Sequence, residues 1–376
     1  MKLSRLQLIE GGEPNTSRYK SLQPFNQKFV IPIEQKGEVN PIALVGINGS
    51  GKSNLLELIA EIFFYLESHF LPYVPKSTPK KFSILFELEY LINIDNQQQS
   101  VKITKHKNKT VEYWLVTDVE NPIKIDDVSF QKKLLPKRIV GYSSGLNETL
   151  SIPFKTSRAL YADEIGLQAN PKSSTKIRPE DVIPPRLMYM DNETNEFILV
   201  SNFLFKAKKK LKIFKDLLRI DSLHSFRIKI QFKHPAAPKG GILRTKELND
   251  YVANLVKCST TSHYLPDTET WTLDFFNCEE TRKAINFYFK SAQNLFEALY
   301  KLSLLNPLCV KGRENRKWAI SNDIFPPDKA FKIENLKLNI INPKDTINYK
   351  GISDGEHQFI HVVGSSMLFD EGNILY

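Results

Sequence analysis

Residues 46–53 of this chain read GINGSGKS and match the phosphate-loop pattern GxxxxGK[ST]. The pattern needs glycines so that backbone N–H groups turn inward around an anion, and it needs a helix directly after it, because a helix N-terminus carries partial positive charge. The apolar run Ile42–Val45 precedes the loop, and apolar residues from Leu55 to Leu66 recur at helical spacing. The sequence therefore predicts a buried strand, a phosphate-binding loop and an amphipathic helix, in that order.

The residue types of this phosphate loop (residues 46–53) indicate their roles. Lys52 would supply a mobile cation to the β- and γ-phosphates of a nucleotide, and the Ser53 hydroxyl would be a ligand for Mg²⁺. The predicted phosphate-contacting residues are Asn48, Gly49, Ser50, Gly51, Lys52, Ser53 and Asn54. A glycine-rich turn without a ligand is the alternative, but the patterns before and after the loop favour nucleotide binding.

Alternating apolar and polar residues predict further strands, and three- and four-residue spacing predicts helices. The strands are expected at 2–9, 28–33, 42–45, 82–91, 101–104, 111–117, 138–142, 225–232, 331–341 and 373–376. The helices are expected at 195–215, 246–257, 279–305 and 351–369. Residues 119–136 are expected to form a loop, and the proline-rich stretch 171–185 is the predicted connector between two parts of the chain.

Length and composition limit the class of protein. A chain of 376 residues predicts two or three packed units at roughly 150 residues per domain. The three cysteines (Cys258, Cys278 and Cys309) lie far apart, which argues against a disulfide-rich secreted scaffold and against a structural zinc site. The richest apolar stretch carries Glu57 and Glu61 and is shorter than the roughly 20 residues that span a bilayer. We expect a cytoplasmic protein with no membrane partner.

The formal net charge of +10 fits an anionic partner such as nucleic acid. The densest basic run lies at 206–215. Its predicted nucleic-acid contacts are Lys206, Lys208, Lys209, Lys210 and Lys212. A run of like charges is more often a solvated helix face, so both interpretations stay open.

The segment Asn48–Glu57 (NGSGKSNLLE) resembles the Walker A motif of ABC-type ATPases of the SMC, RecF and OLD group. The resemblance implies an α/β P-loop NTPase fold: an ABC-type ATPase head, with a mixed sheet and an antiparallel N-terminal subdomain, that carries a large inserted lobe. Residues 1–150 would form the first part of the ATPase domain, 151–330 a mostly helical, basic inserted lobe, and 331–376 the return to the ATPase domain. The expected cofactors are ATP and Mg²⁺.

A second motif of that group, the signature segment, is similar to Ser353-Asp354-Gly355-Glu356. In ABC-type ATPases the signature of one subunit closes over the nucleotide held by the other, so the resemblance implies a head-to-tail homodimer. The same spacing, Ser-x-x-Glu, is also that of an ordinary helix capping box. Tyr142 and Ser143 follow a predicted strand and resemble a loop found in ATPases encoded beside restriction systems, which adds them as further candidate nucleotide contacts.

The third motif of the group, Walker B, would supply the acidic residues for Mg²⁺ and for catalysis. Asp370 and Glu371 lie too close to the signature segment and at the end of its helix, so we expect Walker B beyond Tyr376, at the end of the 373–376 strand. The chain as printed is therefore either truncated or lacks Walker B, and it is expected to bind ATP but to hydrolyse it poorly. No catalytic residue is assigned within it.

The resemblance extends to the AAA ATPases of restriction-associated and anti-phage defence systems, such as the ATPase subunits of Septu- or PARIS-type systems. It implies an ATP-binding or ATPase subunit that forms a homodimer or higher oligomer and controls a separate effector such as a nuclease. Two alternatives stay open: a DNA-repair ATPase of RecF or SMC type, and a scaffold that nucleotide binding locks together without turnover.

Overall fold

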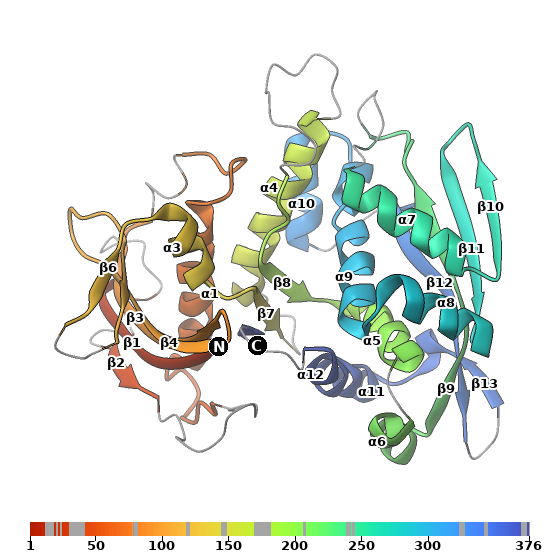
Figure 1. Ribbon diagram of the computed structural model, residues 1–376, viewed down its shortest axis with the longest axis horizontal. Helices are drawn as coiled ribbons and strands as arrows, with labels where there is room; N and C mark the ends of the chain where they lie inside the picture. The colour runs from red at the N-terminus through yellow and green to blue at the C-terminus, as the bar shows by residue number, and fades with distance from the viewer. Residues whose placement is uncertain are drawn as a thin grey trace. The chain divides into compact units, whose positions relative to one another are not determined.

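The computed structural model describes residues 1–11, 19, 22, 25–29, 42–76, 78, 82–117, 121–143, 149–168, 182–205, 208–237, 242, 245–322, 328–341, 345–369 and 374–375. They form a mixed α/β structure whose sheets are mainly antiparallel, and the chain divides into two compact units (Figure 1). The first unit comprises residues 1–157, 185–189 and 371–376, and the second comprises 158–184 and 190–370.

The first unit is built on a six-stranded antiparallel sheet with the order β2-β1-β3-β4-β5-β6. Its strands are β1 (Lys2–Gly11), β2 (Phe25–Lys28), β3 (Ile84–Ile94), β4 (Gln97–Lys105), β5 (Glu112–Leu115) and β6 (Ile123–Ile125). Asp95 and Asn96 both have positive φ, as a two-residue hairpin turn between β3 and β4 requires. The strands predicted at 82–91, 101–104 and 111–117 are confirmed as β3, β4 and β5, which pair antiparallel.

Helix α1 (Lys52–Ser68) packs its apolar face on this sheet. Leu58, Ile62 and Leu66 are fully buried in one cluster with Leu6 and Leu88 of the strands. The unit also contains α3 (Val128–Leu134), the 3₁₀ turn Thr149–Ser151 and the start of α4 (Ile152–Gln168). The helix that the sequence predicts after the phosphate loop is therefore confirmed, and it begins at Lys52.

A small three-stranded sheet, ordered β14-β7-β8, completes the first unit. Its strands are β7 (Arg138–Tyr142), β8 (Leu187–Met190) and β14 (Ile374–Leu375). β14 runs parallel to β7, with Ile374 opposite Arg138. A P-loop NTPase core is built on several parallel strands, whereas the parallel pair recorded among the described residues is this short one, so that fold stays a prediction.

The second unit has a five-stranded antiparallel sheet ordered β10-β11-β9-β12-β13. Its strands are β9 (Ile220–Gln231), β10 (Thr261–Leu265), β11 (Thr270–Phe276), β12 (Phe331–Ile340) and β13 (Asp345–Asn348). Along β9, Phe226, Ile228 and Ile230 are buried while Arg227 and Lys229 are half-buried, so one face of the sheet is apolar. Figure 1 shows helices on one side of this sheet.

The helices of the second unit match the predicted ranges 195–215, 246–257, 279–305 and 351–369 only in part. They are the rest of α4, then α5 (Asn192–Phe205), α6 (Lys208–Leu218), α7 (Lys246–Cys258), α8 (Glu279–Phe289), α9 (Ala292–Ser303), α10 (Arg313–Asn322), α11 (Asp354–Phe359) and α12 (Ser365–Leu368). Short 3₁₀ turns lie at Asn306–Cys309 and Tyr349–Gly351, and a π-helical turn, Ile360–Gly364, joins α11 to α12. The helix expected at 279–305 is broken where Lys290 adopts positive φ.

Several sequence-based expectations need correction. Residues 42–47 form no strand: the apolar run has no sheet neighbour among the described residues, and Val45 is 94% exposed. Residues 119–136 are not simply a loop, because Asp127 accepts hydrogen bonds from the amides of Ser129 and Phe130 and so caps α3. The inserted segment 151–330 contains the helices from Ile152 to Asn322, and it also contributes β8, β9, β10 and β11, of which the sequence predicts only the strand at 225–232.

Other expectations fall outside the described residues. The strand predicted at 28–33 is described only through β2 and Phe29, and the proline-rich connector only at 182–185. Among the helices of the described part, none is long and apolar enough to cross a membrane.

Candidate functional site

The backbone of the phosphate loop forms a tight turn immediately before α1. Gly49 and Gly51 have φ of +82° and +86°, a region that side chains disfavour. A Cβ built on Gly46 would lie 2.7 Å from Ser50 Oγ, so a side chain there would crowd the loop. The Ser50 amide donates to the Ile47 carbonyl at 3.2 Å and closes the turn. The glycines at these positions are thus required by the shape of the loop itself.

The Lys52 side chain folds back over this turn. Its ammonium Nζ donates to the carbonyls of Gly46 and Ile47, both at 2.8 Å, and lies 3.5 Å from Ser50 Oγ. These recorded partners are all neutral oxygens. A cation held by neutral acceptors keeps its charge available to an incoming anion, which could replace a carbonyl as the partner of the ammonium.

The start of α1 offers a second feature that suits an anion. Gly51 is the N-cap residue, no side chain caps the helix, and its first turn contains no acidic residue. The amides of a helix N-terminus together carry about half a positive charge, which favours a phosphate close by. Ser53 lies in this first turn with its side chain exposed, in the position from which a hydroxyl could reach a phosphate-bound magnesium ion.

These residues fit a magnesium nucleotide. Asn48, Gly49 and Ser50 are exposed at the tip of the loop, and Asn54 is half-buried on α1. Lys52 would hold the phosphates, and Ser53 would supply an oxygen ligand to Mg²⁺, the ligand type that this cation prefers. The predicted phosphate-contacting residues 48–54 therefore form one continuous loop and helix start.

The signature segment lies in the second unit, at the start of α11. It forms a complete capping box: the Ser353 amide donates to Glu356 Oε2 at 2.7 Å, and the Glu356 amide donates to Ser353 Oγ at 3.4 Å. The Ser353 hydroxyl donates to the same carboxylate at 2.8 Å. Ser353, Asp354 and Gly355 are exposed. The capping alternative weighed from the sequence is thus the geometry present, and it leaves this corner accessible.

Polar side chains of α5 hold the helix that begins at the signature segment. Asn195 donates to the His357 carbonyl at 3.1 Å, and Asn202 donates to the Gly364 carbonyl at 2.9 Å. The π-helical turn 360–364 follows the first contact and ends at Gly364, which makes the second. Such turns leave carbonyls without their usual helical partner, and they occur often at functional sites. Sequence reasoning missed these two contacts, although Asn202, inside the apolar run FILVSNFLF, could have indicated one of them.

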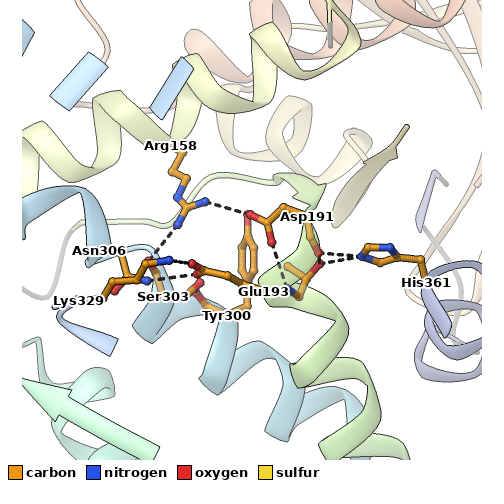
Figure 2. Close-up of polar contacts among 9 residues, drawn as sticks. Arg158, Asp191, Glu193, Tyr300, Ser303, Asn306, Lys329 and His361 are labelled. Carbon is orange, nitrogen blue, oxygen red and sulfur yellow. Dashed lines mark hydrogen bonds and ion pairs between the residues drawn. The ribbon is translucent and has the colours of Figure 1, made fainter. Parts of the chain in front are cut away.

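A polar cluster at the N-terminal end of α5 anchors the same helix (Figure 2). The Asp191 carbonyl lies 2.7 Å from His361 Nε2 and accepts from Thr194 Oγ1 at 2.6 Å. The Asp191 carboxylate faces Arg158, whose guanidinium also donates to the Ser303 carbonyl at 3.2 Å. Burial lowers the pKa of His361, which favours the neutral ring in this contact. His361 is here a structural residue.

A second part of this cluster surrounds Glu193. Glu193 is paired with Lys329 and accepts from Asn306 Nδ2 at 3.3 Å. Asn306 in turn accepts from the Phe331 amide at 2.8 Å, which ties the start of β12 to α5. These contacts are satisfied within the unit, so they indicate a structural role.

For the remaining residues that the sequence singles out, the structure gives little or no information about a site. Tyr142 ends β7, Ser143 follows it, and both stay predictions as nucleotide contacts; burial raises the pKa of Tyr142. Lys206 lies outside the described residues, as do the side chain of Lys208 and the rejected Walker B candidates Asp370 and Glu371.

The described lysines of the basic run lie on α6. Lys209, Lys210 and Lys212 are exposed. Lys212 pairs with Asp216 at 3.7 Å, and Lys215 pairs with Asp221 at 2.6 Å. The basic run is therefore partly neutralised by its own neighbours, which weakens the argument for a nucleic-acid surface here.

No protein-family model, no curated protein and no solved structure matches this chain. The chemistry of the site accordingly rests on its residues and on their geometry.

Proposed function

We propose that the phosphate loop binds ATP with Mg²⁺. Lys52 contacts the phosphates, the first-turn amides of α1 surround them, and Ser53 is a magnesium ligand. One observation carries the proposal: the Lys52 ammonium lies 2.8 Å from two backbone carbonyls of the loop, directly at a helix start that no side chain caps. A purely structural turn would not need a lysine ammonium folded over the loop and a helix start without an N-cap side chain at the same point.

The proposal is tested by replacing the cation. In Lys52→Ala, we expect the affinity for ATP in the presence of Mg²⁺, measured by titration calorimetry, to fall about tenfold to a hundredfold, because a hydrogen bond to a charged group contributes roughly 1.5–3 kcal/mol. Lys209→Ala, which removes an exposed lysine from α6, is the control for loss of charge. Equal ATP affinity in the two variants would overturn the proposal.

A second copy of the chain completes the site through Ser353, Asp354, Gly355 and Glu356. Ser353, Asp354 and Gly355 are exposed and Glu356 is half-buried, and a Cβ built on Gly355 would meet no atom of the described residues within 4 Å. Glycine in a helix costs up to about 1 kcal/mol relative to alanine, so a glycine without a local steric reason suits a corner that another surface approaches closely. When the Ser353 hydroxyl turns to a phosphate, the Ser353 amide still holds the Glu356 carboxylate.

The head-to-tail arrangement is tested by mixing two defective chains in the presence of a non-hydrolysable ATP analogue. Lys52→Ala and Ser353→Arg should each abolish nucleotide-dependent dimers, because each homodimer lacks one half of both sites. A mixed dimer has one complete site, formed by Lys52 of the Ser353→Arg chain and Ser353 of the Lys52→Ala chain. We expect the mixture to regain dimers in sedimentation velocity runs. If the mixture forms no more nucleotide-dependent dimer than either variant alone, the head-to-tail arrangement is contradicted.

The wider role follows from the resemblance of the two motifs to restriction-associated and anti-phage ATPases. The nucleotide-bound dimer is an ATPase-class subunit that controls a separate effector, such as a nuclease. Pull-down of the wild-type chain and of Lys52→Ala, each with the proteins encoded beside it, tests this role. A partner whose capture depends on ATP and on Lys52 supports it, and capture that is the same for both chains contradicts control by the nucleotide.

A further inference from the structure

Strand β10 forms one edge of the five-stranded sheet in the second unit. It pairs on its inner side with β11, from Thr261 opposite Asp274 to Leu265 opposite Thr270, with no shift in register. All five of its side chains are exposed. Among the described residues, no strand lies beyond it, and Figure 1 shows it as the outermost strand of that sheet. Its outer row of backbone N–H and C=O groups is therefore presented to solvent.

This edge lacks the features that usually prevent edge-to-edge pairing. Natural edge strands are commonly protected by proline, by lysine or another charged side chain, or by a bulge. β10 reads TSHYL and contains no proline, no Asp, Glu, Lys or Arg, and no bulge. The opposite edge strand, β13, begins with Asp345. The two edges thus differ, and β10 is the one suited to accept another strand.

We propose that β10 pairs with β10 of a second copy of this chain, antiparallel about a two-fold axis at His263. In that register Ser262 faces Tyr264 of the second copy, and Thr261 faces its Leu265. Because the strand carries no acidic or basic charge apart from the imidazole, no fixed like charges are placed opposite each other. The two five-stranded sheets then form one continuous sheet across the axis. Because both copies use the same strand, the assembly stops at a dimer.

The charges at the two ends of β10 favour a second copy over an unrelated peptide. Lys257, in the last turn of α7, comes just before the strand, and Asp267 lies in the turn just after it; both are exposed. An antiparallel two-fold pair brings the start of one strand beside the end of the other, so Lys257 of each copy approaches Asp267 of its mate. The strand itself carries no Asp, Glu, Lys or Arg side chain that could recognise a particular peptide by its charge.

The expected strength of this contact is modest. A five-residue strand pair with its neighbouring side chains buries less than the roughly 1,200–2,000 Å² of a stable interface. The dimer should therefore dissociate on dilution. It needs no nucleotide, so it is independent of the phosphate loop and of the signature segment.

The experiment uses the Lys52→Ala chain without nucleotide, so that a dimer formed around ATP cannot contribute. Sedimentation equilibrium over a concentration series should give a mass that rises from the 43.3 kDa of the chain toward twice that value. His263→Lys should keep the mass at that of one chain, because two ammonium groups would face each other across the axis. Thr346→Lys, which adds the same charge to the opposite edge strand β13, should dimerise normally.

A second pair of variants distinguishes a lost strand contact from misfolding of the variant chain. His263→Lys and His263→Glu should each be monomeric, and an equal mixture of the two should dimerise, because opposite charges then meet at the axis. The proposal is overturned if the Lys52→Ala chain that keeps His263 stays monomeric throughout the concentration series. It is also overturned if Thr346→Lys disrupts the dimer as much as His263→Lys does, or if the mixture of His263→Lys and His263→Glu stays monomeric. None of these results bears on ATP binding by Lys52, so failure here leaves the proposed function standing.

Discussion

The side-chain amide of Asn202 on α5 donates to the backbone carbonyl of Gly364 at 2.9 Å, inside the π-helical turn that follows the signature segment. The two helices meet so closely at this point that a Cβ built on Gly364 would lie 2.4 Å from Ile198 Cγ2. Asn202 and Ile198 are themselves completely buried and cannot easily move away. The glycine is therefore part of the contact that positions the signature segment.

Gly364→Ala should lower the free energy of unfolding by about 1–3 kcal/mol, because the added methyl group overpacks a rigid contact. Gly355→Ala, in the same helix but with open space around its Cβ, is the matched control and should leave stability unchanged or raise it by up to about 1 kcal/mol. Urea denaturation measures both. Equal stability of the two variants would show that α5 and this helix do not pack as described.

The carboxyl group of Glu67 on α1 is buried in the first unit. It accepts a hydrogen bond from the Arg186 amide at 2.6 Å, and its exposed fraction is 2%. Burial raises the pKa of Glu67 from 4.5 to about 7, against the opposing effects of the Arg186 amide and guanidinium. The folded state thus holds the Glu67 proton more tightly than the unfolded chain does. Its contribution to stability is fully present below about pH 4.5 and is lost as the pH rises through about 7.

Glu67→Gln keeps an acceptor for the Arg186 amide but removes the charge. At about pH 8 the variant should be more stable than wild type, by up to roughly 3 kcal/mol for a pKa shift of this size, and the difference should vanish toward about pH 4.5. Denaturation at several pH values measures this. Glu61→Gln, a half-buried position on the same helix, is the control. A Glu67→Gln advantage that does not depend on pH would contradict the assignment.

The sequence predicts local features well and long-range ones poorly. The phosphate loop, α1 and the β3–β4–β5 meander follow from residue types and periodicity, because each depends on neighbours in the chain. The edge strand β10 does not: its TSHYL residues carry no strong alternation, and what identifies them as a strand is their pairing with β11. The Asn202–Gly364 contact spans 162 positions in the chain. No local pattern specifies such a pair, although a buried asparagine in an apolar helix indicates that a partner must exist.

The role of Ser53 can be separated from that of Lys52. Ser53→Ala should weaken ATP binding in the presence of Mg²⁺ and leave binding in excess chelator nearly unchanged, because only the hydroxyl ligand of the cation is lost. The side chain is exposed, so the fold should tolerate the change. Calorimetric titrations with and without Mg²⁺ measure the two affinities. An equal loss under both conditions would assign the hydroxyl to a phosphate instead of to the metal ion.

Gly355 offers the sharpest test of whether the signature segment serves a second copy. In the part of the chain that the structure describes, nothing lies within 4 Å of a Cβ at this position, so Gly355→Ala should not harm the fold. If the backbone of Gly355 approaches the nucleotide of a partner, the added methyl group stands in the way. We then expect normal ATP affinity in the monomer, unchanged or higher stability, and a loss of at least about tenfold in nucleotide-dependent dimerisation, equivalent to roughly 1.4 kcal/mol. Sedimentation velocity with a non-hydrolysable ATP analogue measures the dimer, and calorimetry measures the binding. If Gly355→Ala dimerises as wild type does, the segment acts only as the cap of α11, which its hydrogen bonds already explain.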